Sequence, residues 1–236
     1  MAVSRVGSWE AMDDGQTFSM GGTDVDPDNW TGTLSVGAGS NRMLVFILMT
    51  EDSSRVTPSS FTIGGQAYSY SGSMYQDASP DNTINVHIWN EAAIDSMSGT
   101  AIVYYDDGNV NNKCAWSFAT YKDVKQASPT ITTNYVTGGK TFDLTTTSTS
   151  NDMIVAAMID KSANRHPFDT DSLTEQIEEH SAQMAISIAD GAGGDNTTTV
   201  VNDDFANSNL GGLAVVLLAT TPVPVIHHHR KQIGAV

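Results

Sequence analysis

Adjacent acidic pairs are the first side chains in this chain that could carry out acid–base chemistry. Glycosidases built on β-sandwiches commonly place two carboxylates on one strand face, two or four residues apart, one as nucleophile or base and the other as acid. Neighbouring residues in a strand point to opposite faces, so the side chains of an adjacent pair diverge. We therefore interpret them as solvated loop or edge charges and predict that the protein is not an enzyme. The pairs are Glu51-Asp52, Glu178-Glu179 and Asp203-Asp204.

Other catalytic patterns are missing from the sequence. It contains no Gly-x-Ser-x-Gly elbow, no phosphate-binding Gly-x-x-x-x-Gly-Lys-Ser/Thr loop and no His-Glu-x-x-His pattern. The single cysteine, Cys114, begins the apolar run 114–119. This setting favours a small core residue over a nucleophile.

Three aspartates have the alternate spacing found in calcium loops. Asp24, Asp26 and Asp28 could supply hard oxygen ligands to a divalent cation. The glycine and the distal glutamate of an EF-hand are missing, and Pro27 restricts the backbone. An ordinary acidic loop is the favoured interpretation, with calcium as the alternative. No other cofactor is predicted.

Aromatic rings could form a platform that stacks on the C–H face of a sugar. Tyr68 and Tyr70 are two residues apart, which predicts one shared strand face. Two aromatics at this spacing more often pack across strands than bind a ligand, so packing is the favoured interpretation. The candidate sugar-binding residues are Trp30, Tyr68, Tyr70, Tyr75 and Trp89.

The last fifteen residues, 222–236, differ in composition from the rest of the chain. Two alternating prolines exclude a central strand and predict an extended arm. The arm carries the one compact basic cluster of the sequence, and we expect it to dock onto an acidic surface of a neighbouring subunit. Histidines gathered on a three-fold axis could alternatively bind a metal ion. The docking residues are Pro222, Pro224, His227, His228, His229, Arg230 and Lys231.

The elements that would position these groups are strands. Short β-like runs follow one another with turn signals every dozen or so residues, which is typical of a sandwich or barrel. The runs 43–49 and 213–218 are almost continuously apolar and should be covered on both faces. In 83–89 apolar and polar residues alternate, which predicts one core face and one partly wet face.

Two turn predictions follow from glycine, asparagine and aspartate. Gly64-Gly65 permits a tight hairpin in which Gln66 and Ala67 start the return strand. The stretch 190–196, Asp-Gly-Ala-Gly-Gly-Asp-Asn, predicts a reversal because these residues tolerate the left-handed backbone. No fixed-period repeat stands out in the sequence, and no helical pattern of convincing length is present.

Charge and hydropathy restrict the partners. The 236 residues carry a net charge of −16, which disfavours phosphate backbones and anionic lipid surfaces. The N-terminal residues lack the apolar core of a signal peptide, and no apolar run reaches the roughly 18 residues of a membrane span. We therefore expect no nucleic acid and no membrane as partners, and synthesis in the cytoplasm.

The order of these segments resembles a group of jelly-roll, concanavalin A-like domains found in phage structural proteins and in some bacterial surface proteins. The resemblance covers about residues 40 to 220, and its motifs are structural strands and turns rather than chemical signatures. The matching segments are Asn41-Arg-Met-Leu-Val45, Phe61-Thr-Ile-Gly-Gly-Gln-Ala67, Val86-His-Ile-Trp89, Ser98-Gly-Thr-Ala-Ile-Val103, Ser117-Phe-Ala-Thr-Tyr-Lys-Asp-Val124, Asn151-Asp-Met-Ile-Val155 and Gly212-Leu-Ala-Val-Val-Leu-Leu218.

This resemblance implies an all-β protein, an antiparallel jelly-roll sandwich over residues 41–221. Residues 1–40 would join the sandwich, and 222–236 would form the arm. The implied function is that of a virion structural protein made in the host cytoplasm, as capsid decoration or cement or as a tail or fibre component. Its partners would be the major capsid protein or further copies of the chain. The alternative is a carbohydrate-binding module that recognises a host glycan or polysaccharide.

Overall fold

The structure of the chain is a computed structural model. It describes residues 1–11, 30–52, 60–76, 81–105, 113–139, 141–160, 168–169, 173–180, 185–194, 197–201 and 208–221. In this part of the chain the strands are antiparallel throughout, with one short helix, α1 (Glu91–Asp95). No helix among these residues is long and apolar enough to cross a membrane.

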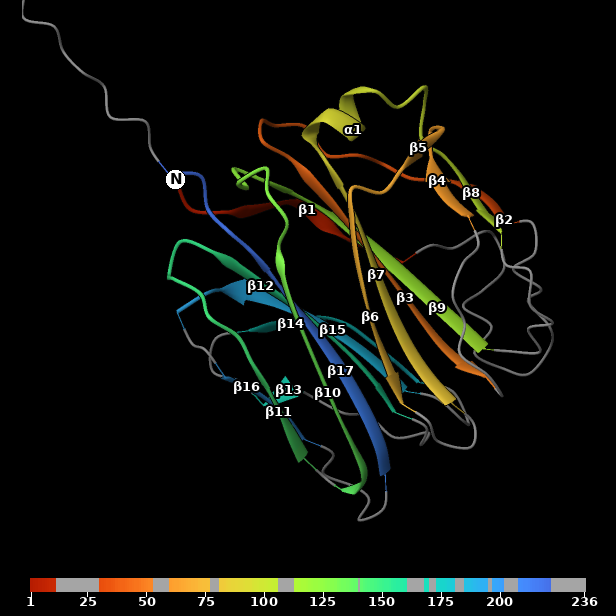
Figure 1. Ribbon diagram of the computed structural model, residues 1–236, viewed down its shortest axis with the longest axis vertical. Coiled ribbons are helices and arrows are strands. Elements are labelled where there is room, and N and C mark those ends of the chain that lie inside the picture. Colours follow the sequence, from red (N-terminus) through yellow and green to blue (C-terminus); the bar gives the residue numbers. More distant parts are fainter. Residues whose placement is uncertain are drawn as a thin grey trace, which may run out of the picture.

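Two five-stranded sheets pack face to face in the centre of the molecule (Figure 1). The first, sheet A, has the strand order β1-β9-β3-β7-β6, and the second, sheet D, has the order β10-β17-β12-β15-β14. The strands of sheet A are β1 (Ser4–Ala11), β3 (Met43–Asp52), β6 (Tyr70–Gln76), β7 (Asp81–Asn90) and β9 (Lys113–Lys122). Those of sheet D are β10 (Thr130–Gly139), β12 (Met153–Asp160), β14 (Thr174–His180), β15 (Ala185–Ala192) and β17 (Ser208–Leu217).

A smaller sheet accompanies each large one. Sheet B has the order β2-β8-β4-β5, and sheet E has the order β11-β16-β13. The strands of sheet B are β2 (Trp30–Thr33), β4 (Ser60–Ile63), β5 (Gln66–Ala67) and β8 (Ala101–Tyr105). Those of sheet E are β11 (Thr141–Thr145), β13 (Phe168–Asp169) and β16 (Thr197–Val201). The all-β antiparallel sandwich predicted from the sequence is confirmed, while its specific assignment as a jelly roll stays a prediction.

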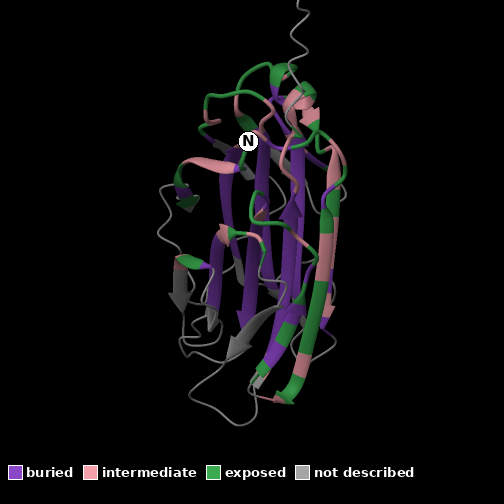
Figure 2. Cartoon of the chain, turned by 90° about the vertical axis from the view of Figure 1, so that its left-hand side faces the viewer, coloured by how far each residue is buried: buried purple, intermediate pink, exposed green. Residues whose placement is uncertain are grey.

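The main hydrophobic core lies between sheets A and D, and further clusters lie on their outer faces. Buried residues fill the central strands (Figure 2). The prediction that 43–49 and 213–218 are covered on both faces is confirmed for 43–49 and 213–217, which are at most 2% exposed. These runs are apolar throughout because their strands have packed layers on both sides.

The outer face of β7 differs from its prediction. Ile84, Val86 and Ile88 point into the core between the large sheets, as their alternation indicates. The opposite face is not partly wet, because His87 is only 4% exposed and Trp89 is fully buried. Trp89 packs with Phe61 of sheet B in the outer cluster. The small sheet therefore turns a two-layer sandwich into a structure with additional outer layers.

The two halves of the chain repeat the same topology. With β5 set aside, β1 to β9 provide eight strands and β10 to β17 provide eight more. Counted within each half, both large sheets have the order first, eighth, third, sixth, fifth, and both small sheets begin second, seventh, fourth. Sheets A and D are thus counterparts that face each other across a pseudo-twofold axis. This repeat was not predicted from the sequence.

Strand registers align the halves residue by residue. Met43 lies opposite Asn90 and Tyr121, and in the second half Met153 lies opposite Ala192 and Leu217. The sequences at these central strands are Ser40-Asn-Arg-Met-Leu-Val45 and Ser150-Asn-Asp-Met-Ile-Val155. The shared apolar spacing reflects the same place in the core, while most other positions have diverged.

The predicted hairpin at Gly64-Gly65 is confirmed. Both glycines have positive φ, +56° and +78°, and Ile63 pairs with Gln66 across the turn. A Cβ on Gly64 would lie 2.3 Å from the Gly99 carbonyl oxygen, whereas one on Gly65 would meet only Ser98 Oγ at 3.8 Å. Backbone conformation thus restricts both positions, and space restricts only the first.

We expect Gly64→Ala to lower the free energy of unfolding by about 1–3 kcal/mol, because it adds left-handed strain and a backbone clash. Gly65→Asn is the matched control and should cost less than about 1 kcal/mol, since asparagine tolerates this conformation. Urea denaturation of both variants measures the difference. Equal losses would contradict the role assigned to the Gly99 contact.

Candidate functional site

A buried carboxylate at the rim of the main core joins the two large sheets. Asp190 of β15 accepts hydrogen bonds from Arg5, Trp9 and Tyr121, which belong to β1 and β9. Arg5 Nη1 lies 2.9 Å from Asp190 Oδ1 and 2.8 Å from Oδ2. Trp9 Nε1 and Tyr121 Oη lie 3.0 and 2.7 Å from Asp190 Oδ2. We call Arg5, Trp9, Tyr121 and Asp190 the Asp190 cluster.

The environment of the Asp190 cluster suits structural bonding. Asp190 is 6% exposed and Tyr121 is fully buried. Burial, together with the Asp190 charge, raises the pKa of Tyr121 well above its usual value, so its hydroxyl stays protonated and donates. The sequence predicts that Asp190 begins a turn. In the structure β15 continues to Ala192, and the left-handed residue is Gly194.

The other half of the molecule has apolar residues at the corresponding places. Asp190 pairs with Val155 in the second half and Ile88 pairs with Val45 in the first half, so Ile88 is the counterpart of Asp190. In the same way Leu217 is the counterpart of Tyr121. Both counterparts, Ile88 and Leu217, are fully buried. The fold therefore tolerates apolar packing at this location, and the polar bonds are a feature of one half only.

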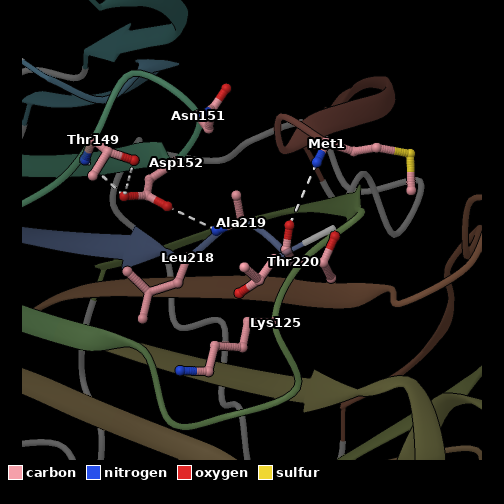
Figure 3. Close-up of a pocket in the computed structure, with 9 residues that line it drawn as sticks. Met1, Lys125, Thr149, Asn151, Asp152, Leu218, Ala219 and Thr220 are labelled. Carbon is pink, nitrogen blue, oxygen red and sulfur yellow. Dashed lines mark hydrogen bonds between the residues drawn. The ribbon is translucent and has the colours of Figure 1, made fainter. Parts of the chain in front are cut away.

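A small open pocket of about 360 Å³ lies where the two halves meet (Figure 3). Its lining includes Asp152, whose Oδ2 accepts from the backbone and hydroxyl of Thr149 at 2.7 and 2.9 Å. Asp152 Oδ1 accepts from the backbone N–H of Ala219 at 2.7 Å. Both carboxylate oxygens are thus engaged in holding a turn and the segment after β17. The remaining lining residues are Met1, Lys125, Asn151, Leu218, Thr220 and Thr221.

The counterpart of Asp152 carries the opposite charge. Arg42, also preceded by Ser-Asn, donates from Nη2 to Glu91 at 2.9 Å and to Asp95 at 2.5 Å. These bonds attach α1 to the beginning of β3. Both positions therefore secure one end of a large sheet, and their ionised groups are occupied by internal partners.

The four aromatic candidates whose side chains are described, Tyr68, Tyr70, Tyr75 and Trp89, do not form an exposed platform. Trp89 is fully buried and donates from Nε1 to the Gln66 carbonyl oxygen at 2.8 Å, so it cannot stack on a sugar. Tyr68 precedes β6, is 37% exposed and lies against His87, with ring centroids 4.6 Å apart. Tyr70 and Tyr75 are part-buried in β6. The structure therefore joins Tyr68 to Trp89 by packing, while the Trp30 side chain lies outside the described residues.

Several predicted residues cannot be placed. The calcium candidates, the docking residues of the arm and the pair 203–204 lie outside the described residues, as do the side chains of Cys114, Glu51-Asp52 and Glu178-Glu179. Within the described part of the chain, no group of three or more His, Cys, Asp or Glu residues is arranged to hold a metal ion. The residues concerned are Asp24, Asp26, Asp28, Pro222, Pro224, His227, His228, His229, Arg230 and Lys231.

The two sides of the sandwich differ in charge. On one side β1 lies near β14, and on the other side their pseudo-symmetric counterparts, β10 and β6, lie together. The sequences of β1 and β14 include an arginine, four glutamates and a histidine, so we call this side the charged flank. The sequences of β6 and β10 contain no charged residue, and we call this side the uncharged flank.

Within the uncharged flank, β10 is the more open strand. It ends its sheet, and β17 is its one ladder partner among the described strands. Thr133, Asn134 and Tyr135 are all exposed, with Tyr135 at 54%. Successive residues of a strand face opposite ways, so the middle of β10 is open on both faces. This strand was not predicted from the sequence, because an open edge strand has no alternation of apolar and polar residues.

Searches against family models, curated proteins and solved structures gave no match for this chain. The resemblance to phage jelly-roll domains therefore rests on the segments of the sequence alone.

Proposed function

We propose that this chain is a structural protein that acts through contacts between subunits. The observation that carries the proposal is the uncharged flank, on a chain whose net charge is −16. Copies of so acidic a protein repel one another, and two strands without charge offer a place where they can approach without burying carboxylates of those strands. The charged flank is built from the pseudo-symmetric counterparts of the same strands and carries charges. The fold itself therefore does not require the uncharged flank to lack charge.

The assembly we propose is a virion, with the chain as capsid decoration or as a tail or fibre component. The resemblance noted in the sequence supports this choice. Internal engagement of the Asp190 cluster and of Asp152 is also consistent with a structural role, because their charged groups hold the sheets together.

Quantitative mass spectrometry of purified particles tests the virion role. We expect the chain to copurify with particles at a fixed ratio to the major capsid protein. A ratio near one or a simple fraction would indicate capsid decoration, and a few copies per particle would indicate a tail or fibre. Absence of the chain from particles would overturn the virion role.

A further inference from the structure

We propose that β10 is the subunit interface and that its partner is β10 of a second copy of this chain. The proposal rests on the structural role proposed above and specifies its contact. Two antiparallel β10 strands related by a two-fold axis would join two copies of sheet D into one continuous sheet.

Comparison of the sheet edges within the molecule supports this choice. Exposed edges pair readily with other chains, and proteins block them with charges, prolines, bulges or short strands. The edge strand β1, the counterpart of β10, carries Arg5 and Glu10 and has a register shift between Val6 and Glu10. β14 contains Glu175 and the pair 178–179.

β10 lacks most of these protections. It is ten residues long, contains neither charge nor proline, and has its register shift only at the end, between Thr137 and Gly139. β10 is held against β6 of the opposite sheet. Gln76 Nε2 donates to the Val136 carbonyl oxygen at 3.0 Å, and Ile131 packs against Gly72, where a side chain would not fit. A firmly held, unprotected strand is a suitable template for strand addition.

A second copy fits this edge better than a charged partner does. Strand pairing between identical chains places the middle of β10 against itself, and β10 itself brings no like charges together because its sequence has none. Tyr135, 54% exposed, would bury its ring beside the axis. Asn134 is engaged, since Nδ2 donates to the Asp143 carbonyl oxygen at 2.8 Å and Oδ1 accepts from the Tyr135 N–H at 2.9 Å. Thr133 and Tyr135 are therefore the residues to replace by glutamate.

Sedimentation velocity of the full chain over a wide concentration range tests the interface. We expect the wild type to dimerise and Thr133→Glu/Tyr135→Glu to raise the dimer dissociation constant by about tenfold or more, because like charges then meet across the axis. Ser8→Glu is the matched control, an exposed position on the counterpart strand β1, and should leave the dimer unchanged. Circular dichroism checks that each variant remains folded.

Cysteine trapping provides a second measurement. Directly opposed residues of antiparallel strands have Cα atoms at a separation that a disulfide can span. In a Cys114→Ser background we expect at least one of Thr133→Cys, Asn134→Cys and Tyr135→Cys to form a disulfide-linked dimer, whereas Ser8→Cys should form no disulfide-linked dimer on oxidation. A wild type that is monomeric at every concentration would overturn the β10 interface. So would a dimer whose dissociation constant is the same in the double glutamate variant and that none of the three cysteines on β10 cross-links.

The outcomes separate the interface from the proposed function. A chain present in particles whose self-association ignores β10 would overturn the interface and leave the structural role standing. A chain that dimerises through β10 and is absent from particles would overturn only the virion role.

Discussion

Replacement of Asp190 by alanine is expected to lower the free energy of unfolding by about 3–5 kcal/mol, as when one partner of a buried ion pair is removed. The carboxylate accepts from Arg5, Trp9 and Tyr121, and two of these donors, on Trp9 and Tyr121, are buried. Without Asp190 their hydrogen-bonding groups lose their partner in the interior. Arg5, whose side chain is 24% exposed, can turn toward water and limits the loss.

Urea denaturation at neutral pH measures this loss. Asp95→Ala is the matched control, because Asp95 also pairs with an arginine but its side chain is 63% exposed. We expect the control to cost less than about 1 kcal/mol, as exposed ion pairs contribute little. Similar losses for the two variants would contradict the importance given to burial of the Asp190 cluster.

The apolar counterparts in the other half give a second test of the same cluster. Tyr121→Leu/Asp190→Ile introduces the residues found at the corresponding positions of the second and first halves, Leu217 and Ile88. Apolar replacement of a buried polar group is often neutral or stabilising, whereas removal of one partner is not. We expect the double variant to be more stable than Asp190→Ala by at least about 1 kcal/mol, a non-additive result typical of contacting residues.

Acid is expected to destabilise the protein through His87. Burial lowers the pKa of His87 from 6.5 to about 4, and neither ring nitrogen has a hydrogen-bond partner. The ring lies against Phe61 and Tyr68 with centroids 5.0 and 4.6 Å apart. The folded state therefore holds the neutral imidazole, and protonation favours the unfolded chain.

The sign follows from proton binding in the two states. Between the folded pKa of about 4 and the unfolded value of 6.5, the unfolded chain binds more protons, so stability rises with pH. His87 contributes fully above 6.5, and its contribution falls as the pH drops through this window. A shift of this size corresponds to a loss of about 3 kcal/mol, at 1.36 kcal/mol per pH unit.

Comparison with His87→Phe isolates this contribution. Phenylalanine keeps an aromatic ring in the cluster but does not titrate, so the wild type should lose about 3 kcal/mol more than the variant between neutral pH and about pH 4. His180→Gln, on the edge strand β14, is the control and should follow the wild type. Parallel pH profiles for the wild type and His87→Phe would show that His87 is not held neutral.

The sequence by itself determined the parts of the fold where burial fixes residue type. The runs 43–49 and 213–217 are apolar because layers cover both faces of their strands, so they could be identified without a structure. The hairpin at Gly64-Gly65 was equally readable, since positive φ at two successive positions strongly favours glycine. Local chemistry and burial leave direct marks on a sequence.

Only the tertiary structure decided which distant segments meet. The local sequence predicts that Asp190 is a turn residue. Its hydrogen bonds with Arg5 and Tyr121 depend on the pairing of β1 with β9 and on the packing of the two sheets. The sequence predicts a partly solvent-exposed outer face for β7, because sheet B, which covers that face, comes from separate segments of the chain. β10 and the internal duplication were not predicted from the sequence. An open edge needs no apolar pattern, and the repeat is preserved in strand order while most residue identities have diverged.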